Sequence, residues 1–154
     1  MKIIDYNKSY LKEIPTLFTN TIHKICNKEY TKEQLTAWAN PNIDYDSWKK
    51  RLDKTKPYLA LIDDTLVGFV EFYDDYIDCF YVHHEYQGQG IGKVLMNHIL
   101  DIASKNGIKI LSVDASITAK AFFETFGFEE VSKNEVKRDN QILINYSLEL
   151  NLQI

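Results

Sequence analysis

Three glycines and a lysine within seven residues form the segment of this sequence best suited to binding an anion. The segment lies between an aromatic-rich, strand-like run and an amphipathic helical pattern, and it reads Gln87-Gly88-Gln89-Gly90-Ile91-Gly92-Lys93. The first N–H groups of a helix have no intrahelical partner and carry the positive end of the helix dipole. Glycines let the backbone approach an anion closely and adopt positive φ. We therefore expect this loop to bind phosphate.

The spacing of the glycines excludes two familiar nucleotide-binding motifs. A dinucleotide fingerprint needs G-x-G-x-x-G after the first strand of a βαβ unit, whereas this chain has G-x-G-x-G after several strands. A P-loop needs Ser or Thr after its lysine, but Val94 follows Lys93. A tight strand-to-helix turn without a ligand is the remaining alternative.

Two carboxylates, Glu71 and Asp78, lie inside strand-like runs and not in turns. A carboxylate in an apolar strand is costly to bury unless it is hydrogen-bonded or functional. Both are therefore candidate proton acceptors, with Glu71 ahead of Asp78, and a solvated edge position is the alternative for each. Strict alternation along the strand predicts that Asp78 shares a face with Phe80, opposite Cys79.

The elements that would position these groups alternate between helix and strand. We expect helices over 11–25, from 31 to about 39, and over 47–52, 91–102 and 118–126. We expect strands over 3–6, 58–62, 66–72, 76–82, 108–113, 128–136 and 141–150. This order predicts an α+β fold with a mixed sheet.

Composition and charge limit the class of protein. The 154 residues are 45% hydrophobic and 26% charged, with a net charge of −4, so we expect one globular domain over 1–154 and no nucleic-acid partner. Cys26 and Cys79 fit neither a disulfide framework nor a zinc pattern, and we expect no metal. The N-terminus lacks a signal-peptide core, and no apolar run reaches about 18 residues. We therefore expect a cytoplasmic protein without a membrane partner.

The strand and loop from 80 to 92 resemble the acetyl-CoA-binding motif of the GNAT N-acetyltransferase superfamily. In that family an apolar strand leads into [Arg/Gln]-x-x-Gly-x-[Gly/Ala], and Gln87, Gly90 and Gly92 stand at its fixed positions. A second family pattern, Asn-x-x-Ala-x-x-x-Tyr-x-x-x-Gly-Phe, resembles the segment 116–128, with Ser116 for Asn and Phe123 for Tyr. The order of elements is also similar from residue 1 to about 150.

The resemblance implies a GNAT fold and a reaction. The fold is a mixed, mostly antiparallel sheet of six to seven strands with helices on both faces. The reaction moves an acetyl group from acetyl-CoA to a primary amine of a small molecule or peptide, by direct attack in a ternary complex. The cofactor contacts that it implies are Phe80, Tyr81, Val82, Gln87, Gly88, Gln89, Gly90, Ile91, Gly92, Lys93, Ser116 and Phe123. Among them, a main-chain N–H near 80–82 would stabilise the negative charge that develops on the thioester oxygen.

Phe123 is the departure from the family that bears on catalysis. The family often has Tyr there, which protonates the departing CoA thiolate, so that role does not transfer to position 123. Tyrosines 73, 76, 81 and 86 lie near the same region. The departure supports a second hypothesis, a non-catalytic CoA-binding sensor or interaction module with the GNAT fold.

The acceptor side is predicted from the N-terminal helices. Tyr30, Gln34 and Trp38 form a pattern similar to one in some small bacterial GNAT proteins, and Gln34 and Trp38 lie on one helix face. The alternative is that Gln34 completes a capping box with Thr31 while Trp38 packs in the core. The final strand pair could also pair between copies and give a homodimer.

Overall fold

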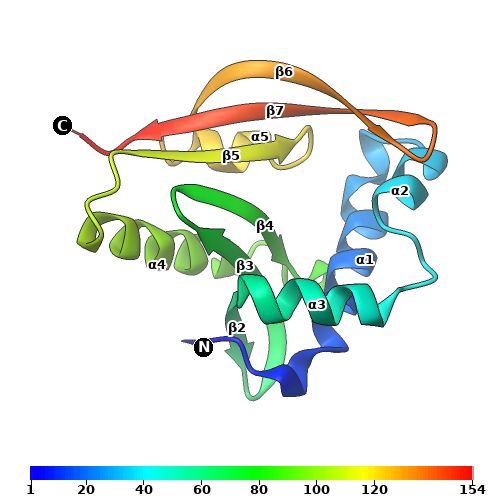
Figure 1. Cartoon of the computed structure of the whole chain (residues 1–154), viewed down its shortest axis with the longest axis horizontal. Coiled ribbons are helices and arrows are strands. Elements are labelled where there is room, and N and C mark those ends of the chain that lie inside the picture. The colour runs from blue at the N-terminus through cyan, green and yellow to red at the C-terminus, as the bar shows by residue number, and fades with distance from the viewer. Residues whose placement is uncertain (154) are drawn as a thin grey trace.

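A seven-stranded sheet organises the chain, and the computed structural model describes residues 1–153. The strand order is β1-β2-β3-β4-β5-β7-β6; β4 and β5 are parallel, and the other neighbouring pairs are antiparallel (Figure 1). The strands are β1 (Lys2–Ile4), β2 (Tyr58–Ile62), β3 (Thr65–Tyr73), β4 (Tyr76–Val82), β5 (Ile110–Ser116), β6 (Glu129–Arg138) and β7 (Gln141–Asn151). The predicted mixed, mostly antiparallel sheet is confirmed. The last residue of the expected domain, 154, lies outside the described residues.

Helices cover both faces of this sheet, as expected. They are α1 (Glu13–Ile25), α2 (Lys32–Trp38), α3 (Tyr45–Thr55), α4 (Ile91–Lys105) and α5 (Lys120–Glu124), with short 3₁₀ turns η1 (Lys8–Tyr10), η2 (Cys26–Lys28) and η3 (His84–Tyr86). Helices α1 to α3 belong to one face, and α4 and α5 belong to the other. Within residues 1–153, no helix combines the length and apolar character needed to cross a membrane.

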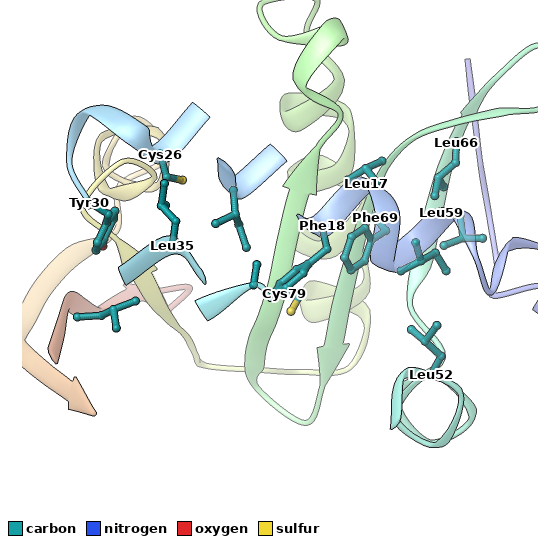
Figure 2. Packing of buried hydrophobic residues seen from close by; sticks show 14 of the residues in the cluster. Leu17, Phe18, Cys26, Tyr30, Leu35, Leu52, Leu59, Leu66, Phe69 and Cys79 are labelled. Carbon is teal, nitrogen blue, oxygen red and sulfur yellow. The ribbon is translucent and has the colours of Figure 1, made fainter. Parts of the chain in front are cut away.

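Two hydrophobic cores lie on the two faces of the sheet. Strand β3 contributes to both: Leu66 and Phe69 pack in the first core, and Val67 and Val70 pack in the second. Figure 2 shows the first core, where Phe69 of β3 lies close to Phe18 of α1. A strand buried on both faces explains why residues 66–72 read as an almost continuous apolar run.

Side-chain caps decide where two of the N-terminal helices begin. The expected capping box opens α2, where Thr31 Oγ1 accepts from Gln34 N at 3.1 Å and Gln34 Oε1 accepts from Thr31 N at 2.9 Å. Asp44 Oδ1 accepts from Ser47 N at 3.1 Å and starts α3 two residues earlier than expected. The longer α3 matters because Arg51 and Thr55 lie on it.

The strand predicted over 108–113 lies instead at Ile110–Ser116. Its start is later because Ile108 N still donates to Ala103 O at 3.0 Å, closing the end of α4. Its end is later because β5 continues to pair with β7 as far as Ser116, opposite Asn145. Ser116 is therefore the last residue of β5.

Candidate active site

Strands β4 and β5 separate after a short contact, and a cleft opens between them. They pair only at Tyr76 with Ser112 and at Ile77 with Val113. From Asp78 onward the β5-facing edge of β4 has no strand partner among residues 1–153. Figure 1 shows the two strands diverging below β7. The resulting cleft has a volume of about 420 Å³ and is lined by residues of β4, β5, β6, β7 and helices α1 to α3 and α5.

The glycine loop has the conformation that the sequence predicts for an anion site. Gly88 and Gly90 have φ of 74° and 80°, and no atom lies within 4 Å of a Cβ placed on either. Within residues 1–153, the N–H groups of residues 88–93 have no hydrogen-bond acceptor. These free donors lie at the start of α4, a helix of 15 residues. The loop therefore combines open space, free N–H groups and a helix dipole.

The other residues of this loop support its shape. A Cβ on Gly92 would lie 2.9 Å from Phe122 Cε1, so α4 and α5 approach each other closely at this residue. Gln87 Nε2 donates to Val82 O at 2.7 Å, which ties the loop back to the end of β4. Lys93 is exposed in the first turn of α4, whereas Ile91 is buried in the second core. Gln87 thus has a structural partner for its side chain.

A β-bulge corrects the expected face of Asp78. Val70 pairs with Phe80 and Phe72 pairs with Ile77, so two residues of β4, Asp78 and Cys79, lie opposite Glu71 alone. Side chains stop alternating between the two faces of the sheet at such a bulge, because the extra residue puts two residues of one strand opposite one residue of its neighbour. Asp78 consequently lies beside Glu71 and Cys79, not on the face of Phe80.

Glu71 lies at the centre of a buried ion pair. Its side chain is fully buried, and Arg51 of α3 donates to it through Nε, at 2.9 and 3.1 Å, and through Nη2, at 2.5 Å. Thr55 Oγ1 donates to Glu71 Oε2 at 2.6 Å. The residues that line the cleft include Arg51 and Asp78 but not Glu71. Whether Glu71 or Asp78 accepts a proton in catalysis stays a prediction.

Arg51 occupies the space between the acidic groups. Oxygen and sulfur atoms of Glu71, Asp78 and Cys79 lie within 4.8 Å of one another, but Arg51 Nη2 is 3.3 Å from Asp78 Oδ1 and 3.0 Å from Cys79 Sγ. A guanidinium therefore takes the place that a metal ion would need. Burial alone would lower the pKa of Arg51, but its hydrogen bonds to Glu71 and the nearby negative charges raise that pKa above its ordinary value.

Two tyrosines donate to the carboxylates of the cleft. Tyr73 donates to Asp78 Oδ2 at 2.6 Å, and Tyr76 donates to Asp114 Oδ2 at 3.1 Å. The hydrogen bond to Asp78, with burial, raises the pKa of Tyr73 to about 12. Burial and the charge of Asp114 raise the pKa of Tyr76. Burial also raises the pKa of Tyr81 well above its usual value, so all three phenols are protonated near neutral pH.

Four of the five remaining predicted cofactor residues line the cleft, from strands β4 and β5 and helix α5. Phe80 and Tyr81 line it directly, while Val82 packs against the second core. Ser116 also lines the cleft, and its Oγ accepts from Ala119 N at 3.0 Å, so it caps the turn before α5. Phe123 lines the cleft too and is buried with its ring centroid 5.6 Å from that of Phe80. Residues from both motifs thus line one cleft, but residues 87–93 of the glycine loop are not among its lining residues, and contact of these residues with a cofactor stays a prediction.

The three predicted acceptor residues have structural partners. Tyr30 donates to Ile144 O at 2.5 Å and accepts from Ile117 N at 2.9 Å. Gln34 completes the capping box and donates to Ile142 O at 2.9 Å, joining α2 to β7. Trp38 is half-buried with its ring against Tyr30 at 5.3 Å. Tyr30 and Trp38 line the cleft and Gln34 does not, so an acceptor-binding role stays a prediction for all three.

Sequence reasoning missed the polar groups that give the cleft its charge, above all Arg51 and Asp114. Arg51 follows two lysines in the run Lys49-Lys50-Arg51, and such a run is typical of a solvated helix face. A signal was present, because Trp48, Leu52 and Thr55 follow the spacing of one helix face and Arg51 lies beside them. Asp114 lies two residues before the segment 116–128, and its partners Tyr76 and Ser147 are distant in the sequence, so no local pattern indicates its role.

Comparison with known proteins identifies the family of this chain. Residues 26–150 match the family model described as an acetyltransferase (GNAT) domain. The uncharacterized N-acetyltransferase YafP of Escherichia coli (strain K12) is 32% identical over 137 residues, which cover 89% of this chain and 87% of YafP.

Two solved structures extend the comparison. A GCN5-related N-acetyltransferase from Rhodopseudomonas palustris has a TM-score of 0.93 at 28% identity, covering 98% of this chain and 95% of that one. The PaiA N-acetyltransferase from Thermoplasma acidophilum, solved in complex with coenzyme A, has the same fold, with a TM-score of 0.73 at 17% identity over 98% of this chain and 99% of that one. The chain is thus an N-acetyltransferase and belongs to the GNAT acetyltransferase family.

Proposed function

We propose that this protein transfers the acetyl group of acetyl-CoA to the primary amine of a small molecule, with both substrates bound at once. One observation carries the proposal: the free N–H groups of residues 88–93 lie at the start of α4, in the loop that follows β4, and β4 lines the cleft that opens where it leaves β5. A CoA diphosphate fits such donors. Two substrates can then meet in the cleft.

The chain's main-chain groups would hold both ends of acetyl-CoA. Gly88 and Gly90 leave space for phosphate oxygens, since no atom lies within 4 Å of their Cβ positions. The unpaired edge of β4 offers N–H groups beyond Asp78 that can stabilise the thioester oxygen as negative charge develops on it. When bound, acetyl-CoA supplies the activated acyl group, and the amine nitrogen forms its new C–N bond as the C–S bond breaks.

Asp78 is the proton acceptor that the geometry favours. An amine with an ordinary pKa of about 10 reaches the cleft as an ammonium ion and must lose a proton before it can attack. Asp78 lines the cleft and its side chain is 32% exposed, whereas Glu71 is fully buried and bonded to Arg51 and Thr55. We therefore place Asp78 ahead of Glu71, the reverse of the order that the sequence suggests.

Tyr81 is the favoured proton donor to the departing thiolate. Tyr73 and Tyr76 donate to Asp78 and Asp114, but the hydroxyl of Tyr81 donates to no acceptor among residues 1–153. Tyr81 lines the cleft on β4, and its raised pKa keeps the phenol protonated. Tyr81 would thus give the cleft a proton donor for the CoA thiolate, a role that Phe123 cannot fill.

The test measures acetyl-CoA binding by calorimetry and amine-dependent thiol release. Gly90→Glu places a negative side chain at the proposed diphosphate site and should weaken binding at least about tenfold. Gly107→Glu is the matched control, because Gly107 also has positive φ, 67°, and open space around its Cβ but lies at the other end of α4. Equal loss in both variants would refute the assignment of the loop.

Thiol release also separates the enzyme from the CoA-binding sensor. Binding of acetyl-CoA with amine-dependent release supports the proposed transferase. Tight binding without release for any amine tested would favour the sensor instead.

A further inference from the structure

The charged groups of the cleft suggest what kind of amine it accepts. Four charged residues line the cleft, the carboxylates Asp78 and Asp114 and the guanidinium groups Arg51 and Arg138. Asp114 is already bonded at both oxygens, by Tyr76 at 3.1 Å and by Ser147 at 2.6 Å. Asp78 accepts one hydrogen bond, from Tyr73 to Oδ2 at 2.6 Å, and among residues 1–153 its Oδ1 has only the ion pair with Arg51 at 3.3 Å. Asp78 therefore has more capacity than Asp114 to accept from an incoming ammonium group.

Arg51 presents an unused edge of its guanidinium. Its Nε and Nη2 atoms face Glu71, and Nη2 also lies near Asp78 and Cys79. The guanidinium carbon is 5.4 Å from the centre of the Trp48 ring, which further restrains it. Among residues 1–153, Nη1 has no hydrogen-bond acceptor. A guanidinium fixed in this way is ready to bind an anion without further ordering.

Arg138 is a second cation without an acidic partner. It ends β6 beside the turn to β7, and its Nη1 reaches only its neighbour's oxygen, Lys137 O, at 3.4 Å. No carboxylate lies within 4 Å of its guanidinium among residues 1–153. The cleft thus contains two guanidinium groups with free N–H donors and one carboxylate, Asp78, for a positive charge.

We propose that the acceptor is an amine with an anionic group next to it, as in a free α-amino acid. The ammonium group would lie at Asp78, and the carboxylate would bind Arg51 Nη1 and Arg138. An α-amino acid carries its ammonium and carboxylate groups on one carbon atom, so its two opposite charges are close together, as are Arg51 Nη2 and Asp78 Oδ1, which are 3.3 Å apart. This inference rests on the proposed function, because it names the acceptor of that same reaction.

The same charges disfavour two other acceptors. A polyamine would place additional positive charge near Arg138, which has no acidic partner to offset it. A lysine side chain or a peptide N-terminus has an amine without an adjacent carboxylate. It would therefore leave the free N–H donors of Arg51 and Arg138 without an acceptor. A polyamine and a lysine-containing peptide are therefore included in the experiment.

The experiment compares thiol release for matched acceptors at saturating acetyl-CoA. L-phenylalanine and L-leucine are each compared with their carboxamides and with their decarboxylated amines, and a lysine-containing peptide and spermidine complete the panel. Loss of a charge-assisted hydrogen bond lowers affinity about tenfold or more. We expect kcat/KM for each amino acid to exceed that for its neutral partners by at least this factor.

Two variants test the assigned cations. Arg138→Gln, at an exposed position, should lower kcat/KM for the amino acids about tenfold while that for the decarboxylated amines stays within about twofold. Lys137→Gln is the control, because Lys137 is an adjacent cation of β6 that does not line the cleft. It should change kcat/KM neither for the amino acids nor for the decarboxylated amines. Arg51→Lys keeps a positive charge beside Glu71 but removes the free Nη1 donors of the guanidinium. It should therefore reduce the preference for amino acids over decarboxylated amines. If Arg51→Lys fails to fold, Arg138→Gln still decides the question.

The outcomes separate this inference from the proposed function. A preference for the amino acids that Arg138→Gln removes supports the inference. Equal or faster release with carboxamides, decarboxylated amines, spermidine or the peptide overturns it while leaving the acetyltransferase function intact. Binding of acetyl-CoA without release for any member of the panel overturns the proposed function and this inference with it.

Discussion

Arg51 connects helix α3 to strand β3, through Glu71, and to strand β4, which borders the cleft, through Asp78. A fully buried carboxylate such as Glu71 needs a charged partner, and a guanidinium fork provides one with fixed geometry. Thr55, one turn later on α3, adds a donor to the same carboxylate. Since Arg51 also reaches Asp78, the position of α3 influences the geometry of the exposed carboxylate. A structural ion pair and a candidate catalytic group are therefore joined through one side chain.

The two carboxylates should respond differently to removal of charge. Asp78→Asn should lower kcat by about 100-fold or more with little loss of stability, because it removes a proton acceptor at the cleft surface. Glu71→Gln should lower the free energy of unfolding by about 3 kcal/mol, because it leaves Arg51 without its main partner. Rates at saturating substrates and urea unfolding measure the two effects. A large kcat loss in Glu71→Gln, with unchanged unfolding and normal rates in Asp78→Asn, would reverse the assignment.

The ionisation of Tyr73 reports the state of Asp78. The hydrogen bond from Tyr73 to Asp78 and the negative charge beside it disfavour the phenolate, which is why the pKa of Tyr73 is raised to about 12. Asp78→Asn removes that charge, so the pKa of Tyr73 should fall toward the ordinary tyrosine value of about 10. A pH titration followed by ¹³C NMR of labelled tyrosines measures the shift, and Tyr73→Phe identifies the signal. An unchanged titration would show that the two side chains do not interact in solution.

At the scale of elements, helix α2 is joined to the sheet through its first turn. Gln34 takes part in the capping box and reaches β7 at Ile142 O. Gln34→Ala should therefore lower the free energy of unfolding by about 1 kcal/mol and leave KM for the acceptor within about twofold. Thermal unfolding and steady-state rates test both parts. A large rise in KM with unchanged stability would instead make Gln34 a substrate contact.

Helices α4 and α5 meet at Gly92, where no side chain fits. A Cβ there would lie 2.9 Å from Phe122 Cε1, so Gly92→Ala should destabilise the protein by about 1–3 kcal/mol through overpacking. Adding Phe122→Leu to this variant should recover part of the loss, because it shortens the ring that the new methyl meets. Denaturant unfolding of the single and double variants measures this coupling. Equal stability of wild type and Gly92→Ala would contradict the close packing.

Local elements were predictable from the sequence, and their relative placement was not. The glycine loop and the capping box depend on residues within one or two turns, so Gly90 and Thr31 could be interpreted without the fold. The bulge at Asp78 and Cys79 has no Gly or Pro to mark it, and it defeated the alternation rule. The role of Arg51 depends on how α3 lies against β3, which is set by packing between residues distant in the chain.

The whole molecule has a narrow junction at its centre. Strands β1 to β4 and strands β5 to β7 form one sheet, but β4 and β5 are joined through two residue pairs only, at Tyr76 and Ile77. The cleft begins where this junction ends, and both sides contribute its walls. A ligand in the cleft would therefore add contacts between the two parts of the sheet, so binding should stabilise the folded chain as a unit.

Coenzyme A should consequently raise the temperature of unfolding. A ligand at about 100 times its Kd stabilises the folded state by about 2.7 kcal/mol, which for a chain of this size is a rise of about 5–10 °C. Hydrogen exchange should slow at the free edge of β4 beyond Asp78, because its amides gain partners or lose solvent access. At the same concentration of coenzyme A, a tenfold loss of affinity in Gly90→Glu should reduce the stabilisation to about half, about 1.4 kcal/mol, and Gly107→Glu should retain both effects. An undiminished rise in Gly90→Glu would mean that the nucleotide binds away from the glycine loop, since only there does the added charge oppose the diphosphate.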